Sequence, residues 1–163
     1  MIKVGFIGNG NMGSMLIDRF LTAGRFLSSE IIVSSENKTS SDPFQARWDE
    51  INVAIDNVHV VRAAKYVFLC AEPSEAENVL REIKDCITDD TNIISTGFPA
   101  SIRRMESVAD CKISKLAPTM IAENGKRISV ICHSNKVEES EADYIESLVR
   151  EICHAKAYKA RRF

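Results

Sequence analysis

The nine residues GFIGNGNMG, at positions 5–13, decide how this chain is interpreted. Four glycines in nine positions suit neither a helix nor the interior of a strand. A short apolar run rich in branched residues, at positions 2–7, leads into the glycines and predicts a buried strand. Apolar residues then recur at helical spacing over positions 12–21, and Gly24 is expected to end that helix. The stretch is therefore predicted to be a tight turn between a buried strand and an amphipathic helix.

The turn fits the pattern G-x-G-x-x-G, with Gly8, Gly10 and Gly13 at the three glycine positions. The first glycine permits the tight turn, the second lets a pyrophosphate approach the backbone, and the third lets the helix pack close to the strand. The helix N-terminus offers N–H groups and a positive dipole end to an anion. No Gly-Lys-Ser/Thr follows, which excludes a P-loop. The alternative is a glycine-rich turn without a ligand, but the flanking strand and helix favour a dinucleotide site.

Strand-like and helix-like segments alternate along the rest of the chain. Further strands are predicted at residues 31–33, 51–55, 66–71, 92–95, 113–116 and 128–131. Helices are predicted at residues 44–50, 58–64, 74–87, 101–108 and 137–152. Ser74 and Glu77 form a capping-box pattern, which predicts the start of the helix at 74–87. This alternation is typical of an α/β fold of the Rossmann type, a doubly wound and mostly parallel sheet with helices on both faces.

The last two predicted strands are joined by the short segment 118–126. Too few residues remain there for a helical crossover, so an antiparallel strand pair is open near the C-terminus. One NAD(P)-binding domain is expected over residues 1–153, followed by a basic tail at 154–163.

Composition excludes several classes of function. A net charge of −2 argues against a broad nucleic-acid surface. No apolar run reaches the roughly 18 residues that a membrane span needs, and no signal peptide is recognisable. The cysteines are odd in number and dispersed, which suits neither a zinc clip nor a disulfide framework, so a reduced cytoplasm is the expected setting. They are Cys70, Cys86, Cys111, Cys132 and Cys153.

The loop after the second strand bears on the choice of dinucleotide. Ser34, Ser35 and Lys38 could hold the 2′-phosphate of NADP. Glu36, if it points inward, would repel that phosphate and favour the ribose hydroxyls of NAD. The sequence therefore leaves both NADP and NAD open as cofactors.

Several stretches resemble the pyrroline-5-carboxylate reductase family, in order and over nearly the whole chain. The opening GFIGNGNMGSML is similar to that family's GFIGxGNM, and Asn57 lies 16 residues before Pro73, as a cofactor-contacting Asn does there. VFLCAEP at 67–73 resembles VFLAVKP, and IISTGFPASI at 93–102 resembles IISxxAGVSI. KLAPTMIAENG at 115–125 resembles the RxMPNTP segment beside the nicotinamide.

The resemblance implies hydride transfer from NAD(P)H to a cyclic imine, 1-pyrroline-5-carboxylate, giving proline. Together with the turn and the loop above, it gives a set of expected cofactor-binding residues. They are Gly8, Asn9, Gly10, Asn11, Met12, Gly13, Ser34, Ser35, Glu36, Lys38, Asn57, Ala71, Pro73, Thr96 and Gly97. No catalytic acid or base is assigned, because the dispersed His59, His133 and His154 are interpreted as structural or exposed. Hydride transfer needs no protein nucleophile, since the cofactor carries the chemistry.

The chain also departs from that family. Glu72 replaces the Lys of VKP, and the stretch corresponding to MPNTP reads APTMI. The chain ends near the point where the family's helical second domain begins, and that domain supplies the family's dimer interface and substrate contacts. An imine substrate and a homo-oligomer are compatible with the resemblance. The alternative function is a non-catalytic dinucleotide-binding or regulatory protein of the same fold, such as a relative resembling competence proteins.

Overall fold

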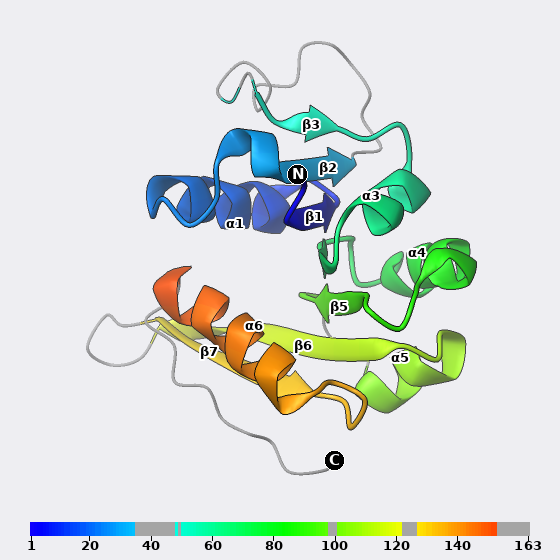
Figure 1. The fold of residues 1–163 in the computed structure, drawn as a ribbon. Coiled ribbons are helices and arrows are strands. Elements are labelled where there is room, and N and C mark those ends of the chain that lie inside the picture. The colour runs from blue at the N-terminus through cyan, green and yellow to red at the C-terminus, as the bar shows by residue number, and fades with distance from the viewer. Residues whose placement is uncertain (35–47, 49, 98–100, 122–126, 153–163) are drawn as a thin grey trace.

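A computed structural model describes residues 1–34, 48, 50–97, 101–121 and 127–152 of the chain. They form one seven-stranded sheet in the order β3-β2-β1-β4-β5-β6-β7 (Figure 1). The strands are β1 (Val4–Ile7), β2 (Ile31–Ser34), β3 (Asn52–Val53), β4 (Tyr66–Leu69), β5 (Asn92–Ser95), β6 (Lys112–Ile121) and β7 (Arg127–His133).

All neighbouring strands pair in parallel except β6 and β7, which are antiparallel. The chain runs outward from β1 through β2 to β3 and then returns to place β4 on the other side of β1. The strand order therefore reverses between β1 and β4, and ligands bind at such a reversal in open α/β sheets. This topology confirms the predicted Rossmann-type sheet and the antiparallel pair near the C-terminus.

The helices cover both faces of the sheet (Figure 1). Helices α1 (Asn11–Thr22) and α6 (Glu139–Ile152) lie together on one face. The opposite face is covered by α3 (Asn57–Ala63), α4 (Ala76–Ile83) and α5 (Ile102–Val108). Two short 3-10 turns, η1 (Ser28–Glu30) and η2 (Lys84–Cys86), complete the described elements.

Each face of the sheet has its own apolar core, because neighbouring side chains of a strand point to opposite faces. On the α1/α6 face Phe6 stacks on Phe68 with ring centroids 5.1 Å apart, and Phe20 of α1 packs against both rings. Leu80 and Ile93 belong to the core of the other face. All four residues of each of the strands β1, β2 and β5 are buried, which is typical of parallel strands covered on both sides.

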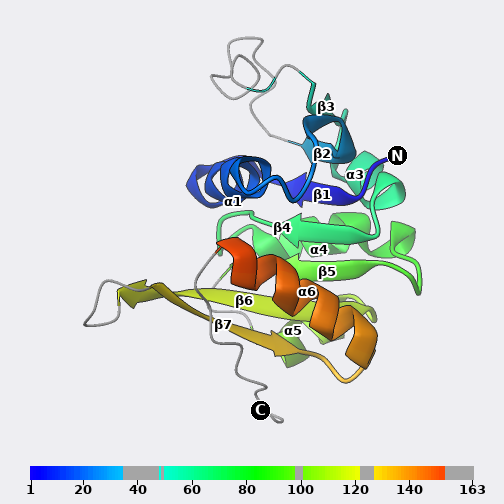
Figure 2. The same cartoon turned by 60° about the vertical axis from the view of Figure 1, so that its left-hand side comes forward.

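The strands β6 and β7 extend past the rest of the sheet as a two-stranded arm, which Figure 2 shows in profile. The pairing of β6 with β5 ends at Lys115, whereas its pairing with β7 continues to Ile121. Both strands are longer than predicted, because they pair with each other beyond the point where β5 ends.

The start of helix α4 was wrongly predicted. Helix α4 begins at Ala76, and its N-cap residue Glu75 makes no capping hydrogen bond with its side chain. The carboxylate of Glu77 binds Arg81 at 2.7 Å and Arg104 at 2.9 Å. The capping box expected from Ser74 and Glu77 does not form, because two arginine cations are stronger partners for that carboxylate than a backbone N–H.

The helix also ends at Ile83 and continues only as the 3-10 turn η2, so it is shorter than the predicted 74–87. The predicted strand at 51–55 is reduced to the two residues of β3. Most of the predicted helix at 44–50 and all of the predicted tail at 154–163 lie outside the described residues.

Candidate functional site

The glycine turn joins β1 to α1, and each glycine meets a different steric demand. Gly8 has φ +91°, a conformation that side chains rarely adopt, and a Cβ there would lie 2.9 Å from the carbonyl oxygen of Cys70. A Cβ on Gly13 would lie only 2.1 Å from the carbonyl oxygen of Gly8. A Cβ on Gly10 would meet no atom within 4 Å. Two glycines thus close the turn, and the third leaves open space above it.

That open space faces the N-terminus of α1. Gly10 is the N-cap residue, so no side chain caps the helix, and the first turn contains no acidic residue. The N–H groups of the first helical turn have no partner within their own helix, and the dipole adds positive character. The hydroxyl of Ser14 donates to the carbonyl oxygen of Asn9 at 2.6 Å, which fixes the loop before the helix. The arrangement presents N–H donors where an anion can approach the backbone.

Backbone hydrogen bonds bring the carboxyl ends of four strands to this turn. The N–H of Gly8 donates to the carbonyl oxygen of Ser34, the last residue of β2, at 3.0 Å. The N–H of Cys70, just after β4, donates to Ile7 at 2.8 Å, and the N–H of Thr96, just after β5, donates to Leu69 at 3.1 Å. Residues far apart in the sequence therefore share one edge of the sheet, beside the reversal between β1 and β4.

A chain of side-chain hydrogen bonds crosses the β2 end of this edge. The buried Ser34 donates from Oγ to Oδ1 of Asn57, the first residue of α3, at 2.6 Å. Asn57 donates from Nδ2 to Oε2 of Glu82 on α4 at 2.9 Å. The sequence reasoning predicted Ser34 and Asn57 for the site but missed Glu82. No local signal marks it, because Glu82 reads as one more polar residue on the exposed face of a helix.

A buried thiol and a threonine occupy the β4 and β5 end of the edge. Burial raises the pKa of Cys70 to about 12, although a hydrogen bond with Thr96 acts in the opposite direction. The hydroxyl of Thr96 donates to the carbonyl oxygen of Leu69 at 3.2 Å. Cys70 therefore stays a neutral thiol at physiological pH, which makes it a packing residue and not a base.

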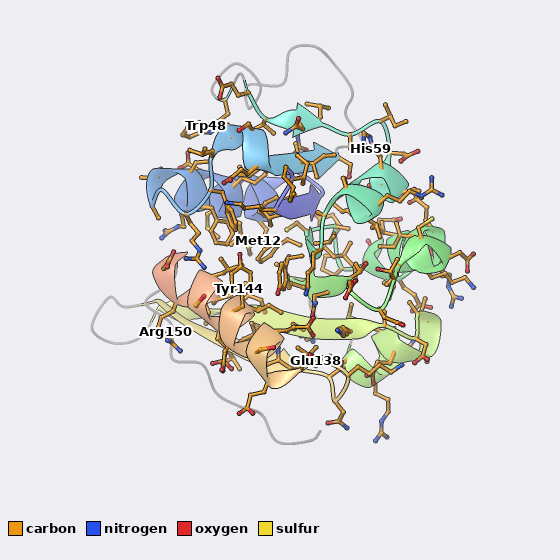
Figure 3. The ribbon with its side chains drawn as sticks, viewed as in Figure 1. Met12, Trp48, His59, Glu138, Tyr144 and Arg150 are labelled. Atoms are coloured by element: carbon orange, nitrogen blue, oxygen red, sulfur yellow. The ribbon has the colours of Figure 1, made fainter. Side chains whose placement is uncertain are left out.

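The other expected site residues divide into three groups. Asn11 is exposed at the start of α1, whereas Met12 is half-buried and packs against the core shared with Tyr144 of α6 (Figure 3). Ala71 and Pro73 belong to the turn between β4 and α4, and Gly97 is buried just after β5. Ser35, Glu36 and Lys38 lie outside the described residues.

The two described histidines lie in different settings. His59 is exposed on α3, and its Nδ1 accepts from the backbone N–H of Ile55 at 3.5 Å. Nδ1 of His133 lies 2.7 Å from the hydroxyl of the buried Ser114. The pairing of His133 with Ser114 puts it at the amino-terminal edge of β6, away from the glycine turn. His154 lies outside the described residues.

A cavity of about 380 Å³ lies at that opposite edge, between the starts of β5 and β6. Its walls include Lys112 and Lys136, but each already has an acidic partner, Glu141 and Asp110 respectively. Both lysine charges are therefore already paired with acidic side chains of the fold. Among the residues that the structure describes, no group of three histidine, cysteine or acidic side chains is arranged as metal ligands. None of the described helices has the length and hydropathy of a membrane span.

The chain is similar to known proteins over most of its length. Residues 3–99, more than half of the chain, match the family described as NADP oxidoreductase, coenzyme F420-dependent. ComE operon protein 4 of Bacillus subtilis is 24% identical over 153 residues, which are 94% of this chain and 56% of that protein. The pyrroline-5-carboxylate reductase of Staphylococcus saprophyticus is 27% identical over 150 residues, which are 91% of this chain and 55% of that protein.

The same fold occurs in the crystal structure of Plasmodium falciparum pyrroline carboxylate reductase with NADP bound. It superposes with a TM-score of 0.81 at 21% identity and covers 97% of this chain and 58% of that one. At this identity the likeness shows the fold. The chain spans little more than half the length of these relatives.

Proposed function

The chain belongs to the family described as NADP oxidoreductase, coenzyme F420-dependent, and we propose that it binds a nicotinamide dinucleotide at the glycine turn. The observation that carries the proposal is the open space above Gly10, where an added Cβ would meet nothing within 4 Å. A pyrophosphate in that space would accept hydrogen bonds from the first N–H groups of α1. The adenosine ribose would lie toward Ser34 and Asn57, and the nicotinamide toward Ala71, Thr96 and Gly97.

The proposed reaction is hydride transfer from the reduced nicotinamide to the carbon of a C=N bond. Support comes from relatives named pyrroline-5-carboxylate reductase, one of which covers 91% of this chain. The dinucleotide carries the hydride, and the chain's residues bind and orient it. The proposed substrate is a cyclic imine of the 1-pyrroline-5-carboxylate type.

A second candidate is a protein of the same fold that binds a dinucleotide without catalysis. It is favoured by APTMI at residues 117–121, where the pyrroline-5-carboxylate reductase family has MPNTP. Binding with no turnover of any imine would select this candidate.

The test of dinucleotide binding is a titration of the chain with NADH and NADPH by calorimetry, with Gly10→Val and Gly10→Ala as variants. Gly10 has φ −62°, which valine also adopts, and the site around it is empty, so the valine variant is expected to fold normally. Its side chain would occupy the space of the pyrophosphate, so we expect binding to be lost. The smaller alanine should weaken binding less.

Two results would contradict the proposal. One is the absence of heat with either dinucleotide in the wild-type protein. The other is unchanged binding in Gly10→Val. An assay of NAD(P)H oxidation with 1-pyrroline-5-carboxylate then separates the reductase from the non-catalytic candidate.

A further inference from the structure

We propose that the hydrogen-bond chain from Ser34 through Asn57 to Glu82 selects a dinucleotide whose adenosine ribose carries a free 2′-hydroxyl. The protein is then expected to bind NADH in preference to NADPH. The inference rests on the proposed function and adds the specificity of the same site. It assigns the role of a positioning residue to Glu82, which belongs to α4 and not to the loop that usually reads the ribose.

The direction of the chain is fixed from its carboxylate end. A carboxylate accepts hydrogen bonds and a primary amide both donates and accepts, so Asn57 must turn Nδ2 toward Glu82, 2.9 Å away. Its Oδ1 then faces Ser34 and must accept, at 2.6 Å. The single hydroxyl hydrogen of Ser34 is thereby committed to Asn57.

This direction decides what the β2 end of the site offers to a ligand. A 2′-phosphate carries only acceptors and is bound by donors and cations. A ribose hydroxyl can donate, so it is bound by acceptors. With its hydrogen committed, Ser34 offers only oxygen lone pairs, and the chain ends on a negative charge at Glu82. Both features favour the hydroxyl over the phosphate.

The carboxylate of Glu82 has different partners from that of Glu77 on the same helix. Glu77 is neutralised by Arg81 and Arg104 at 2.7 Å and 2.9 Å. Glu82 is exposed, and within the described part of the chain its recorded partner is the neutral amide of Asn57. Among the described residues no cation offsets the charge of Glu82, so this carboxylate is expected to repel a phosphate, and Glu77 provides a matched control.

The experiment measures dissociation constants of the wild-type chain and its variants by calorimetry, for ADP-ribose against 2′-phospho-ADP-ribose and for NADH against NADPH. We expect the wild type to bind the members without the 2′-phosphate more tightly. The Glu82→Gln substitution removes the negative charge and lets the side-chain amide of Asn57 take either orientation. The ratio of the dissociation constants of the phosphorylated and unphosphorylated ligands should therefore fall by about tenfold. Glu82→Lys should lower it further, and Glu77→Gln should leave it unchanged. Both positions are on the helix surface, and thermal unfolding checks that each of the three variants folds.

The outcomes are distinct. Equal or tighter binding of the phosphorylated ligands by the wild type overturns this inference and leaves dinucleotide binding intact. A preference for NADH that is the same in Glu82→Gln, Glu82→Lys and Glu77→Gln also overturns it. Failure of every ligand to bind overturns both this inference and the proposed function. A preference that falls in the order wild type, Glu82→Gln, Glu82→Lys supports the assignment.

Discussion

A Cβ atom on Gly13 would lie 2.1 Å from the carbonyl oxygen of Gly8, so the first turn of α1 rests directly on the turn that leaves β1. The atom that this Cβ would meet belongs to the backbone, so no side-chain rotation can relieve the clash. It fixes the angle at which α1 leaves the sheet, and with it the direction of the N–H groups in the first helical turn. The packing glycine therefore acts on the candidate site without facing a ligand.

We expect Gly13→Ala to lower the free energy of unfolding by about 3 kcal/mol, because the backbone must shift to admit the methyl group. Gly10→Ala is the matched control. It adds the same methyl group three residues earlier, where nothing lies within 4 Å, and should change stability by less than about 0.5 kcal/mol. Urea unfolding of both variants measures the difference. Equal stability of the two would show that the helix does not rest on the turn in this way.

The helix caps make a second prediction. The Asp56 carboxylate caps α3 by accepting from the N–H of His59 at 2.7 Å, so Asp56→Ala should cost about 1 kcal/mol. Ser74→Ala should cost less than about 0.5 kcal/mol, because α4 begins after it and takes no cap from it. Thermal unfolding of the two variants is the measurement. A larger loss from Ser74→Ala than from Asp56→Ala would restore the capping box that the sequence suggested.

A third prediction concerns the contact between α6 and the amino-terminal edge of the sheet. The nearly buried Glu141 accepts from Lys112 at 3.0 Å and from the fully buried Asn92 at 3.2 Å. Glu141→Gln leaves the Lys112 charge without its close carboxylate partner and should cost about 2 kcal/mol in denaturant unfolding. The control is Glu138→Gln, whose exposed carboxylate lies 4.0 Å from Lys112 and should contribute almost nothing. Equal effects of the two substitutions would contradict the assignment.

The same ion pair predicts a pH window. Burial raises the pKa of Glu141, but hydrogen bonds from Lys112 and Asn92 outweigh it and hold the pKa below the usual 4.5. Its contribution to stability is therefore complete above pH 4.5 and is lost as the pH falls through the lower folded value. The hydrogen bond to Glu141 raises the pKa of Lys112 above 10.5, so its contribution is complete below that pH and is lost at higher pH. The stability difference between wild type and Glu141→Gln should thus be greatest between these limits and shrink in acid.

The cysteines should separate by reactivity. Burial raises the pKa of Cys70 to about 12 and that of Cys111 to about 11, so both are protonated at pH 8. Cys86 and Cys132 are only half-buried. Iodoacetamide at pH 8 should therefore modify Cys86 and Cys132 at least about tenfold faster than Cys70 and Cys111, as read by peptide mass spectrometry. Rapid modification of Cys70 in the folded protein would show that the β4 end of the site is more open than the structure has it.

The sequence by itself determined where the strands occur, the order of the strands and the described helices, and the glycine turn. Strands such as 66–69 (YVFL) are continuous apolar runs, and α1 shows its buried face as a helical period, so both signals are local. The roles of Gly8 and Gly13 could also be predicted, because a strand followed directly by a helix leaves few backbone routes between them. The choice between NAD and NADP could not be made from the loop after β2, whose residues support either.

The tertiary structure decided which polar side chains meet. Asn57 and Glu82 are 25 residues apart and share a hydrogen bond because α3 and α4 lie side by side on one face of the sheet. Arg104 of α5 likewise binds Glu77, so Glu77 does not form the capping box that the local sequence pattern predicted. A long charged side chain has many partners within reach, and only the packing of the helices selects one of them. The backbone of the site was thus specified locally, whereas its proposed specificity depends on contacts that exist only in the folded chain.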